Sequence, residues 1–221
     1  MNTCILISSL DKFTETGKQC IEGCIKTGLN KFPIFYSSES IPLQNSESIL
    51  TGPGEWSHRM RLSLKYIDLK YSNILLLLED FIPKKVNHNI LDLSIEYHIK
   101  HADLTKFGYF DLFKLNILKN LTNQYFTCKQ ELQPYRISHQ PIAIWKRSFL
   151  EETLRKDVCP AGHEIEVNDD LQNGDFGKKN IVCITKCKPQ LFSPGLDQGE
   201  IIEYHHAIFR GKEIKYTGKY D

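Results

Sequence analysis

The sequence predicts a single α/β domain with a Rossmann-like, mostly parallel central sheet flanked by helices. Three observations support this fold class: a strand–helix–strand pattern at the N-terminus, a short apolar run at 74–78, and later strand-like segments interleaved with helical ones. A strand, a helix and a second strand in succession form the βαβ unit, whose strands are parallel. A length of 221 residues suits one such domain with a sizeable core.

The N-terminal segment contains the predicted βαβ unit. Residues 3–8 are apolar and β-branched enough to form a buried strand. Apolar residues then recur at helical spacing from 14 to 26, and Gly28 is a suitable helix stop. Residues 33–37 have the composition of the second strand, so we expect these two strands to be parallel neighbours.

The most informative stretch is a short apolar strand followed directly by two acids. Residues 74–78 are all Ile or Leu, too few to cross a membrane, and Glu79 and Asp80 come next. Such a run is typical of a strand buried on both faces, and ligands of open α/β sheets bind where the strands end. The acids are therefore candidates for binding a divalent cation, which in turn would bind a diphosphate. Alternatively, they only solvate the end of the strand. We expect Pro83 to stop the strand, because it lacks a backbone donor.

Further elements are predicted along the rest of the chain. Helices are expected from near Glu55, from the N-cap Asn87 to about His101, and from 147 to 156. Strands are expected at 107–113, at 124–128 after a short helix in 115–133, at 135–145 with a turn at Pro141, at 180–185 and at 201–208. Pro160 and Gly162 indicate a turn just before two alternating acids.

Composition and charge exclude several classes of function. Lys and Arg number 28 against 27 Asp and Glu, so the chain lacks the basic excess of a nucleic-acid binder, and we expect no nucleic-acid partner. No segment has the roughly 18 apolar residues of a transmembrane helix, and the N-terminus lacks the pattern of a signal peptide. Seven scattered cysteines, an odd number, indicate reduced thiols rather than a disulfide framework, so we expect a cytoplasmic protein.

The order and spacing of these motifs resemble the small bacterial GT-A-type glycosyltransferases of surface-polysaccharide synthesis, which build lipopolysaccharide or capsule. The resemblance covers nearly the whole chain and depends on the segments ILISSLDKF, EWSHRMRLSLKYI, NILLLLEDFIP, YRISHQPIAIWKRSFL, CPAGHEIE and EYHHAIFRGK. It implies a single GT-A-like domain, with a nucleotide-binding half at 1–112 and an acceptor-side half at 113–221.

The resemblance also implies a donor site at the ends of the first strands. Ser8, Ser9 and Asp11, in the loop after the first strand, would lie against the nucleoside. Arg59 would neutralise the diphosphate as a planar, always-charged donor, and its alternative is a solvated helix face. The expected donor is a nucleotide sugar, with a UDP-sugar as the first choice.

A divalent cation, Mn or Mg, is the cofactor that the resemblance implies. Asp80 matches the last, metal-binding acid of the family's Asp-x-Asp motif, and Glu79 matches the acid beside it. Leu78 stands where the first Asp would be, which leaves strict metal dependence open. His205, one of two adjacent histidines, would complete the metal shell, and its alternative is an ordinary surface or core imidazole.

An inverting transferase also needs a carboxylate that takes the proton of the acceptor hydroxyl. By analogy with the family, Glu164 is the first choice for this base and Glu166 the second. The two side chains would share a face in an extended segment and point to roughly opposite faces in a helix. Their alternative is an acidic helix start or an exposed turn, and a retaining mechanism would not need this base.

Together these expectations describe a glycosyltransferase that moves a sugar from a nucleotide donor to a glycan or lipid-linked acceptor, with peripheral association with the inner membrane left open. One alternative is a sugar nucleotidyltransferase, although residues 8–12 lack the Gly-rich, basic phosphate loop usual in that class. The other alternative is a catalytically inactive scaffold that binds a nucleotide sugar or only a partner, which the missing acid at Leu78 keeps open.

Overall fold

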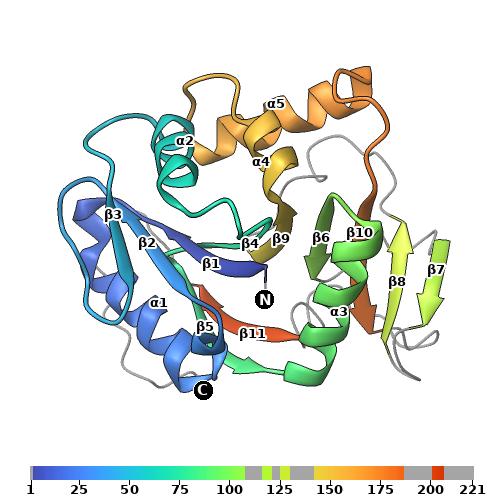
Figure 1. Ribbon diagram of the computed structural model, residues 1–221, viewed down its shortest axis with the longest axis horizontal. Coiled ribbons are helices and arrows are strands. Elements are labelled where there is room, and N and C mark those ends of the chain that lie inside the picture. The colour runs from blue at the N-terminus through green and yellow to red at the C-terminus, as the bar shows by residue number, and fades with distance from the viewer. Residues whose placement is uncertain (1, 108–115, 121–124, 130–141, 187–200, 207–221) are drawn as a thin grey trace.

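The computed structural model describes residues 2–107, 116–120, 125–129, 142–186 and 201–206 (Figure 1). None of the helices in these ranges has the length and apolarity that crossing a bilayer requires.

In the described part of the chain, nine strands form one central sheet in the order β3-β2-β1-β4-β9-β6-β10-β8-β7. All run in the same direction except β9 and β8, which pair antiparallel with their neighbours, so the predicted mostly parallel sheet is confirmed. The strands are β1 (Thr3–Ser8), β2 (Ile34–Ser38), β3 (Glu47–Leu50), β4 (Asn73–Leu78), β6 (Leu104–Phe107), β7 (Asn116–Asn120), β8 (Tyr125–Lys129), β9 (Ile142–Lys146) and β10 (Ile181–Lys186).

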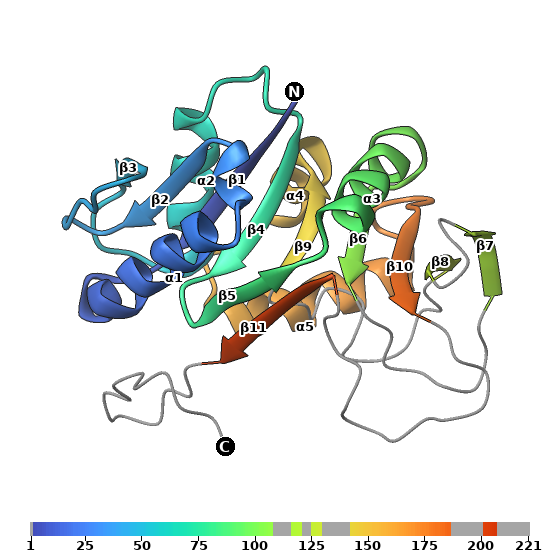
Figure 2. The same cartoon turned by 90° about the horizontal axis from the view of Figure 1, so that it is seen from below.

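Helices cover both faces of this sheet, which explains why β1 and β4 are apolar on both sides (Figures 1 and 2). One face carries α1 (Thr14–Lys26) and α3 (His88–His101), and the other carries α2 (Trp56–Tyr66), α4 (Arg147–Thr153) and α5 (Pro160–Asn173). Alternate residues of β1 separate the two cores. Ile5 and Ile7 pack with α1 and α3, whereas Cys4 and Leu6 pack with the α2 side.

Several predicted elements are confirmed by the structure. The predicted helix at 14–26 has the same bounds in α1. Asn87 caps α3, because its side chain accepts a hydrogen bond from the backbone N–H of Ile90. Two 3₁₀ turns, η1 (Asp11–Phe13) and η2 (Leu29–Lys31), flank α1, and Gly28 supplies the left-handed conformation between α1 and η2 with a φ of 76°.

The expected role of Pro83 is wrong. The strand β4 ends at Leu78, and Pro83 lies inside the next strand, β5 (Phe81–Val86). This strand pairs with β11 (Ile202–His206) in a separate two-stranded sheet, which Figure 2 shows on the α1 and α3 side. A strand that pairs on one side has no neighbouring strand to hydrogen-bond with on its other side. It can therefore contain a proline, which lacks a backbone N–H. The pairing also shifts register at the residue opposite Pro83.

Two other local predictions are also wrong. The segment after Cys159 begins helix α5 instead of forming a turn, because Pro160 occupies the first helical turn, where no backbone donor is needed. Gly162 fits this helix because a β-carbon there would lie 3.1 Å from the Val158 side chain. The expected short helix before β8 is the strand β7. The predictions for 108–113, for 135–141 and for the residues after 206 lie outside the described residues. The division into halves at 112 stays a prediction.

Candidate functional site

The strands β1, β2 and β4 end at the same edge of the sheet. In the parallel register, Ser8 lies beside Ser37 of β2 and beside Leu78 of β4. The backbone continues this alignment by one residue, since the N–H of Ser9 donates to Ser37 and the N–H of Glu79 donates to Ser8. The polar loops after the three strands therefore meet at one edge, where α/β sheets bind ligands.

Arg59, on α2, is the central cation of this edge. Its side chain is 1% exposed, and its Nη2 donates a hydrogen bond to the backbone carbonyl of Ser9. Among the described residues, the buried Nε and Nη1 have no hydrogen-bond partner. Burial lowers the pKa of Arg59 below its usual value, and the nearby charges of Glu39, Glu79 and Asp11 offset only part of this shift. A buried guanidinium keeps its charge, so two of its nitrogens stay available to an anion.

Asp11 organises the loop that follows β2. Its carboxylate accepts hydrogen bonds from the backbone N–H groups of Glu39, Ser40 and Ile41, at 3.0 to 3.2 Å, and from the Ser40 hydroxyl at 2.5 Å. In return, the Glu39 carboxylate accepts from the backbone N–H of Asp11 at 3.1 Å. Desolvation acts to raise the pKa of Asp11, but these hydrogen bonds outweigh it and lower the pKa. Asp11 therefore fixes the two loops relative to each other.

Tyr36 fills the space below this edge on the α1 side. Its side chain is fully buried, and burial raises the pKa of its hydroxyl. The charges of Glu79 and Asp11 raise this pKa further, while the Ser9 hydroxyl lowers it. The ring fits because residue 17 on α1 is glycine, where a β-carbon would lie 2.6 Å from the tyrosine oxygen.

Glu79 and Asp80 form the turn that joins β4 to β5. Burial, and then the charge of Asp80, raise the pKa of Glu79 to about 8, although its own backbone N–H and the charges of Arg59 and Lys12 lower it. At neutral pH this carboxyl group is largely protonated unless a cation compensates its charge.

His205 is the second predicted metal ligand, and the structure gives its backbone position in β11. In the β5–β11 pair, His205 lies opposite Ile82 and His206 opposite Phe81. Both positions are therefore at the end of the ribbon next to Asp80. Among the described residues, no three His, Cys, Asp or Glu side chains lie close enough together to hold a metal ion.

The helix α5 carries the two predicted bases, Glu164 and Glu166. They point to roughly opposite faces of the helix, as expected for the helical alternative. Glu164 is partly buried and lies on the face that buries Val167 and Leu171. Glu166 forms an ion pair with Lys156, with 3.1 Å between the ammonium and the carboxylate. The two acids therefore lie on different faces of α5.

Three solved structures share this fold at low sequence identity. The catalytic domain of Drosophila β1,4-galactosyltransferase 7, in complex with xylobiose, has a TM-score of 0.54 and 11% identity over 99% of this chain and 76% of that one. A fragment of S. aureus TarS has a TM-score of 0.51 and 10% identity over 83% and 58%, so the chain spans less than two thirds of it. A CMP:2-keto-3-deoxy-manno-octonic acid synthetase complexed with CTP has a TM-score of 0.50 and 12% identity over 82% and 88%.

The chain has a GT-A-like fold. No protein-family model matches the sequence, and no curated protein sequence matches it. At these identities the similarity establishes the fold alone.

The GT-A-like fold brings the predicted donor residues together at the edge of the sheet: Ser8, Ser9, Asp11, Arg59, Glu79 and Asp80. Glu164 and Glu166 lie on the helix layer on the α2 side of the sheet. Two further charged residues at this edge, Glu39 and Lys12, are not among the residues predicted from the sequence. Glu39 follows β2 directly, so inspecting the residue after every parallel strand would have found it. Lys12 lies in the polar segment after β1, and nothing in its sequence pattern distinguishes it from the other residues of that segment.

Proposed function

We propose that the protein is a glycosyltransferase that moves a sugar from a nucleoside-diphosphate donor to an acceptor hydroxyl. The observation that carries this proposal is Arg59, a buried cation whose Nε and Nη1 lack partners at the edge where three parallel strands end. Burying a charge and leaving two donors unsatisfied is costly, so the arrangement favours a ligand that brings negative oxygens to this side chain. Phosphate oxygens match the planar guanidinium well.

The polar loops around Arg59 support a nucleotide rather than a free phosphate. Ser8 is 1% exposed and has a buried hydroxyl without a partner in the described part of the chain. Ser9 and Asp11 lie in the loop that Arg59 and Glu39 hold in place. We propose that this loop binds the nucleoside while Arg59 binds the diphosphate.

The residues present fit a hard divalent cation. Mg and Mn prefer oxygen ligands and are often held by one or two carboxylates together with substrate phosphates. Glu79 supplies such a carboxylate near Arg59, Asp80 supplies a second one in the same turn, and His205 would be a further ligand. When bound, the cation would neutralise charge on the departing diphosphate. The elevated pKa of Glu79 fits this assignment, since a cation would replace its proton.

The chemical step transfers the sugar from one oxygen to another. The acceptor oxygen forms a bond to the anomeric carbon while the bond from that carbon to the diphosphate oxygen breaks. In the inverting form of the reaction, Glu164 accepts the proton of the acceptor hydroxyl and the nucleoside diphosphate leaves with the electron pair. We keep Glu164 as the first choice for this base and Glu166, which forms an ion pair with Lys156, as the second.

We propose the donor and acceptor classes from one solved structure of similar fold. A mutant of the Drosophila galactosyltransferase 7 has been crystallised with manganese, UDP-Gal and xylobiose, and it matches this chain with a TM-score of 0.51. We therefore propose a UDP-sugar donor and a glycan or lipid-linked acceptor. We also propose a cytoplasmic role in surface-polysaccharide synthesis, with peripheral association with the inner membrane where the acceptor is a lipid.

The second candidate function is a sugar nucleotidyltransferase, favoured by the match to the CMP:2-keto-3-deoxy-manno-octonic acid synthetase complexed with CTP. The two functions release different products. A glycosyltransferase releases a nucleoside diphosphate from a nucleotide sugar, whereas a synthetase of this kind releases inorganic diphosphate from a nucleoside triphosphate. Assays of both products with panels of nucleotide sugars and nucleoside triphosphates separate them, and binding without either product would indicate a scaffold.

The direct test of the proposed donor site is UDP binding by calorimetry to Arg59→Gln, with Lys65→Gln as the control. Lys65 is an exposed cation on the same helix, so its loss changes net charge equally without touching the site. We expect Arg59→Gln to weaken UDP binding by about tenfold or more, the effect of losing a charge-assisted hydrogen bond. Equal UDP affinity in the wild type and in Arg59→Gln, with both proteins folded by circular dichroism, would overturn the assignment.

A further inference from the structure

The outer face of α2 holds the segment that connects α4 to α5. Ser57 and Arg61 lie one helical turn apart, so both side chains project from the same side of α2. The Ser57 hydroxyl donates to the carbonyl of Lys156 at 2.6 Å and accepts from the backbone N–H of Val158 at 2.7 Å. The backbone N–H of Ser57 donates to the carbonyl of Val158 at 3.1 Å. The segment is thus paired with the first turn of α2.

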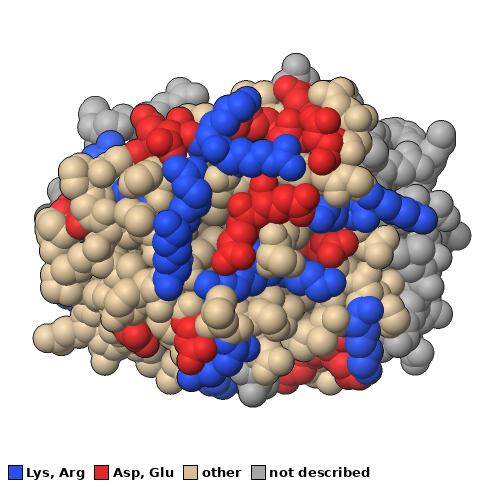
Figure 3. Space-filling view, turned by 45° about the horizontal axis from the view of Figure 1, so that its top comes forward, with Lys and Arg blue, Asp and Glu red and all other residues tan. Residues whose placement is uncertain are grey.

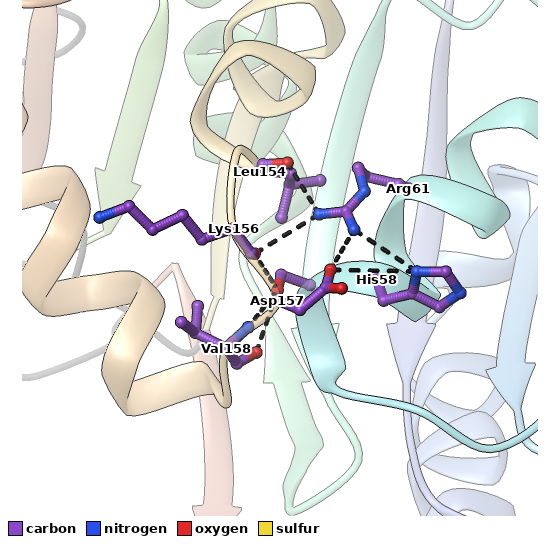
Figure 4. Close-up of polar contacts among 7 residues, drawn as sticks. His58, Arg61, Leu154, Lys156, Asp157 and Val158 are labelled. Carbon is purple, nitrogen blue, oxygen red and sulfur yellow. Dashed lines mark hydrogen bonds and ion pairs between the residues drawn. The ribbon is translucent and has the colours of Figure 1, made fainter.

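The Arg61 guanidinium contacts the same segment at three points (Figure 4). Its Nη1 donates to the carbonyls of Leu154, at 2.9 Å, and Lys156, at 3.4 Å. Its Nη2 donates to the carboxylate of Asp157 and lies 3.4 Å from Nδ1 of His58. A planar guanidinium can reach two carbonyls and a carboxylate together, which a lysine ammonium cannot. We call the contacts of Ser57 and Arg61 with this segment the α2 clasp.

The α2 clasp fixes the place where α5 begins. Residues 154–159 contain no helix or strand, so α2 side chains satisfy backbone groups that regular structure would otherwise pair. Immediately afterwards, the ring of His163 on α5 lies 5.0 Å from that of Trp56 on α2. The Nε2 of His163 also lies 3.0 Å from the Thr153 hydroxyl of α4. The first turn of α5 is therefore set against both α2 and α4.

Ion pairs extend the clasp across this face of the molecule. Lys156, whose carbonyl is held by α2, reaches with its ammonium to Glu166 on α5. Figure 3 shows basic and acidic side chains interspersed over the face that carries α2, α4 and α5. In the described part of the chain, four ion pairs between Lys or Arg and Asp or Glu link these elements and their connections: Arg61–Asp157, Lys156–Glu166, Arg155–Asp170 and Lys179–Glu152.

The same helix contacts the proposed donor site on its opposite side. Arg59 lies two residues from both Ser57 and Arg61, which is about 200° around a helix. Accordingly, Arg59 is buried against the end of β1, whereas Arg61 contacts the connection to α5. One rigid helix therefore carries both the proposed diphosphate-binding residue and the clasp that fixes α5.

We propose that Arg61 is a positioning residue of the transferase, which acts with Ser57 to hold the start of α5, and with it Glu164, at a fixed distance from Arg59. This inference rests on the proposed function, because the position of α5 matters to turnover only if its carboxylate acts on the acceptor. Transfer requires the donor and the base to be aligned within a fraction of an ångström. Losing the clasp would therefore lower the rate of transfer more than the binding of the donor.

The test compares Arg61→Gln and Arg61→Lys with the wild type and with the control Lys65→Gln. Amide hydrogen exchange is measured without substrate over residues 156–165, together with UDP affinity and the kcat and donor KM of transfer. In Arg61→Gln we expect exchange in this range to rise about tenfold, UDP affinity to change less than twofold, and kcat to fall about tenfold at a nearly constant KM. We expect Arg61→Lys to be intermediate, because it keeps the charge beside Asp157 but loses the two separate guanidinium nitrogens. We expect Lys65→Gln to match the wild type.

Two results would overturn the inference. One is unchanged exchange over 156–165 in Arg61→Gln. The other is a parallel loss of UDP affinity and kcat, which would indicate general unfolding of α2. The exchange measurement needs no turnover, so it separates this inference from the proposed function. If the wild type transfers no sugar, the proposed function fails, while faster exchange in Arg61→Gln still supports the clasp.

Discussion

Arg59 on α2 donates a hydrogen bond to the backbone carbonyl of Ser9, which lies directly after β1. This contact ties the first turns of α2 to the edge of the sheet and brings a buried cation among the acids that follow β1, β2 and β4. The proposed donor site depends on this contact between α2 and the end of β1.

Replacing Asp80 with Asn should remove the proposed cation site. Asp80 follows Glu79 in the turn between β4 and β5, and an amide holds a divalent cation much more weakly than a carboxylate. We expect turnover to fall on the order of 100-fold. We also expect the rise in Tm that Mn produces in the presence of UDP to disappear. Asp92→Asn is the control, because Asp92 is an exposed partner of Lys31 on α3. A Tm shift with Mn that is the same in Asp80→Asn and the wild type would exclude Asp80 as a ligand.

Glu79 should make the ligand-free protein less stable as the pH rises. Its pKa is about 8 in the folded state against an ordinary value of 4.5. Between these values the folded state binds a proton that the unfolded state lacks, so stability is lost as the pH rises through this window. Glu79 is partly exposed, so we expect a small effect. Between pH 5 and pH 8, the free energy of unfolding of Glu79→Gln should rise by only about 1–2 kcal/mol relative to that of the wild type. Urea unfolding at both pH values measures this gain, and a constant difference between the two proteins would show that Glu79 titrates normally. Glu47→Gln, on the exposed edge strand, serves as the control.

His163 should have the opposite dependence on pH. Burial lowers the pKa of its imidazole to about 4 from an ordinary 6.5. Between these values the unfolded state binds a proton that the folded state does not, so stability is lost as the pH falls through the window. The free energy of unfolding of the wild type should fall between pH 7 and pH 4.5. In His163→Gln we expect this fall to be smaller by about 1–3 kcal/mol. The exposed His101→Gln should behave like the wild type, and an acid dependence unchanged in His163→Gln would contradict the prediction.

Replacing Gly17 with Ala should displace Tyr36. The new β-carbon would lie 2.6 Å from the tyrosine oxygen and 2.7 Å from a ring carbon, and the ring is fully buried. We expect a loss of about 1–3 kcal/mol in the free energy of unfolding, despite the higher helix propensity of alanine. Weaker UDP binding should accompany this loss. The neighbouring exposed residue gives the control variant Lys18→Ala, which should not reduce stability. A Gly17→Ala protein as stable as the wild type would show that the ring can move.

Arg147 should stabilise the C-terminal end of α2. Its guanidinium donates to the carbonyl of Leu64, in the last turn of α2, and to the carbonyls of Ile67 and Asp68, which directly follow the helix. The last carbonyls of a helix have no partner within the helix. We expect Arg147→Met to lose about 2–4 kcal/mol in urea unfolding, because buried acceptors lose a charged donor. Lys100→Met removes an exposed ion pair with Glu96 and should cost less than about 0.5 kcal/mol. Similar losses in both variants would refute a capping role for Arg147.

Much of the fold could be predicted from the sequence, because local patterns specify local structure. The spacing of Cys20, Ile21 and Cys24 predicted α1 to the residue, and the apolar run at 74–78 predicted a strand buried on both faces. The polar residues after β1 and β4 could also be placed at one edge, because parallel strands bring their carboxyl ends together. These predictions need only the periodicity of a helix or strand and the handedness of the chain.

The tertiary structure decided which residues face one another. Pro83 predicts the end of a strand, yet it lies inside β5, which pairs with the sequence-distant β11 and shifts register opposite this proline. Only the tertiary structure placed Lys156 beside α5, where it forms an ion pair with Glu166. Residues such as Arg59 have no local pattern that shows burial or the lack of a partner. Both properties arise from packing between segments about 50 or more residues apart, and such contacts leave no periodic signal in the sequence.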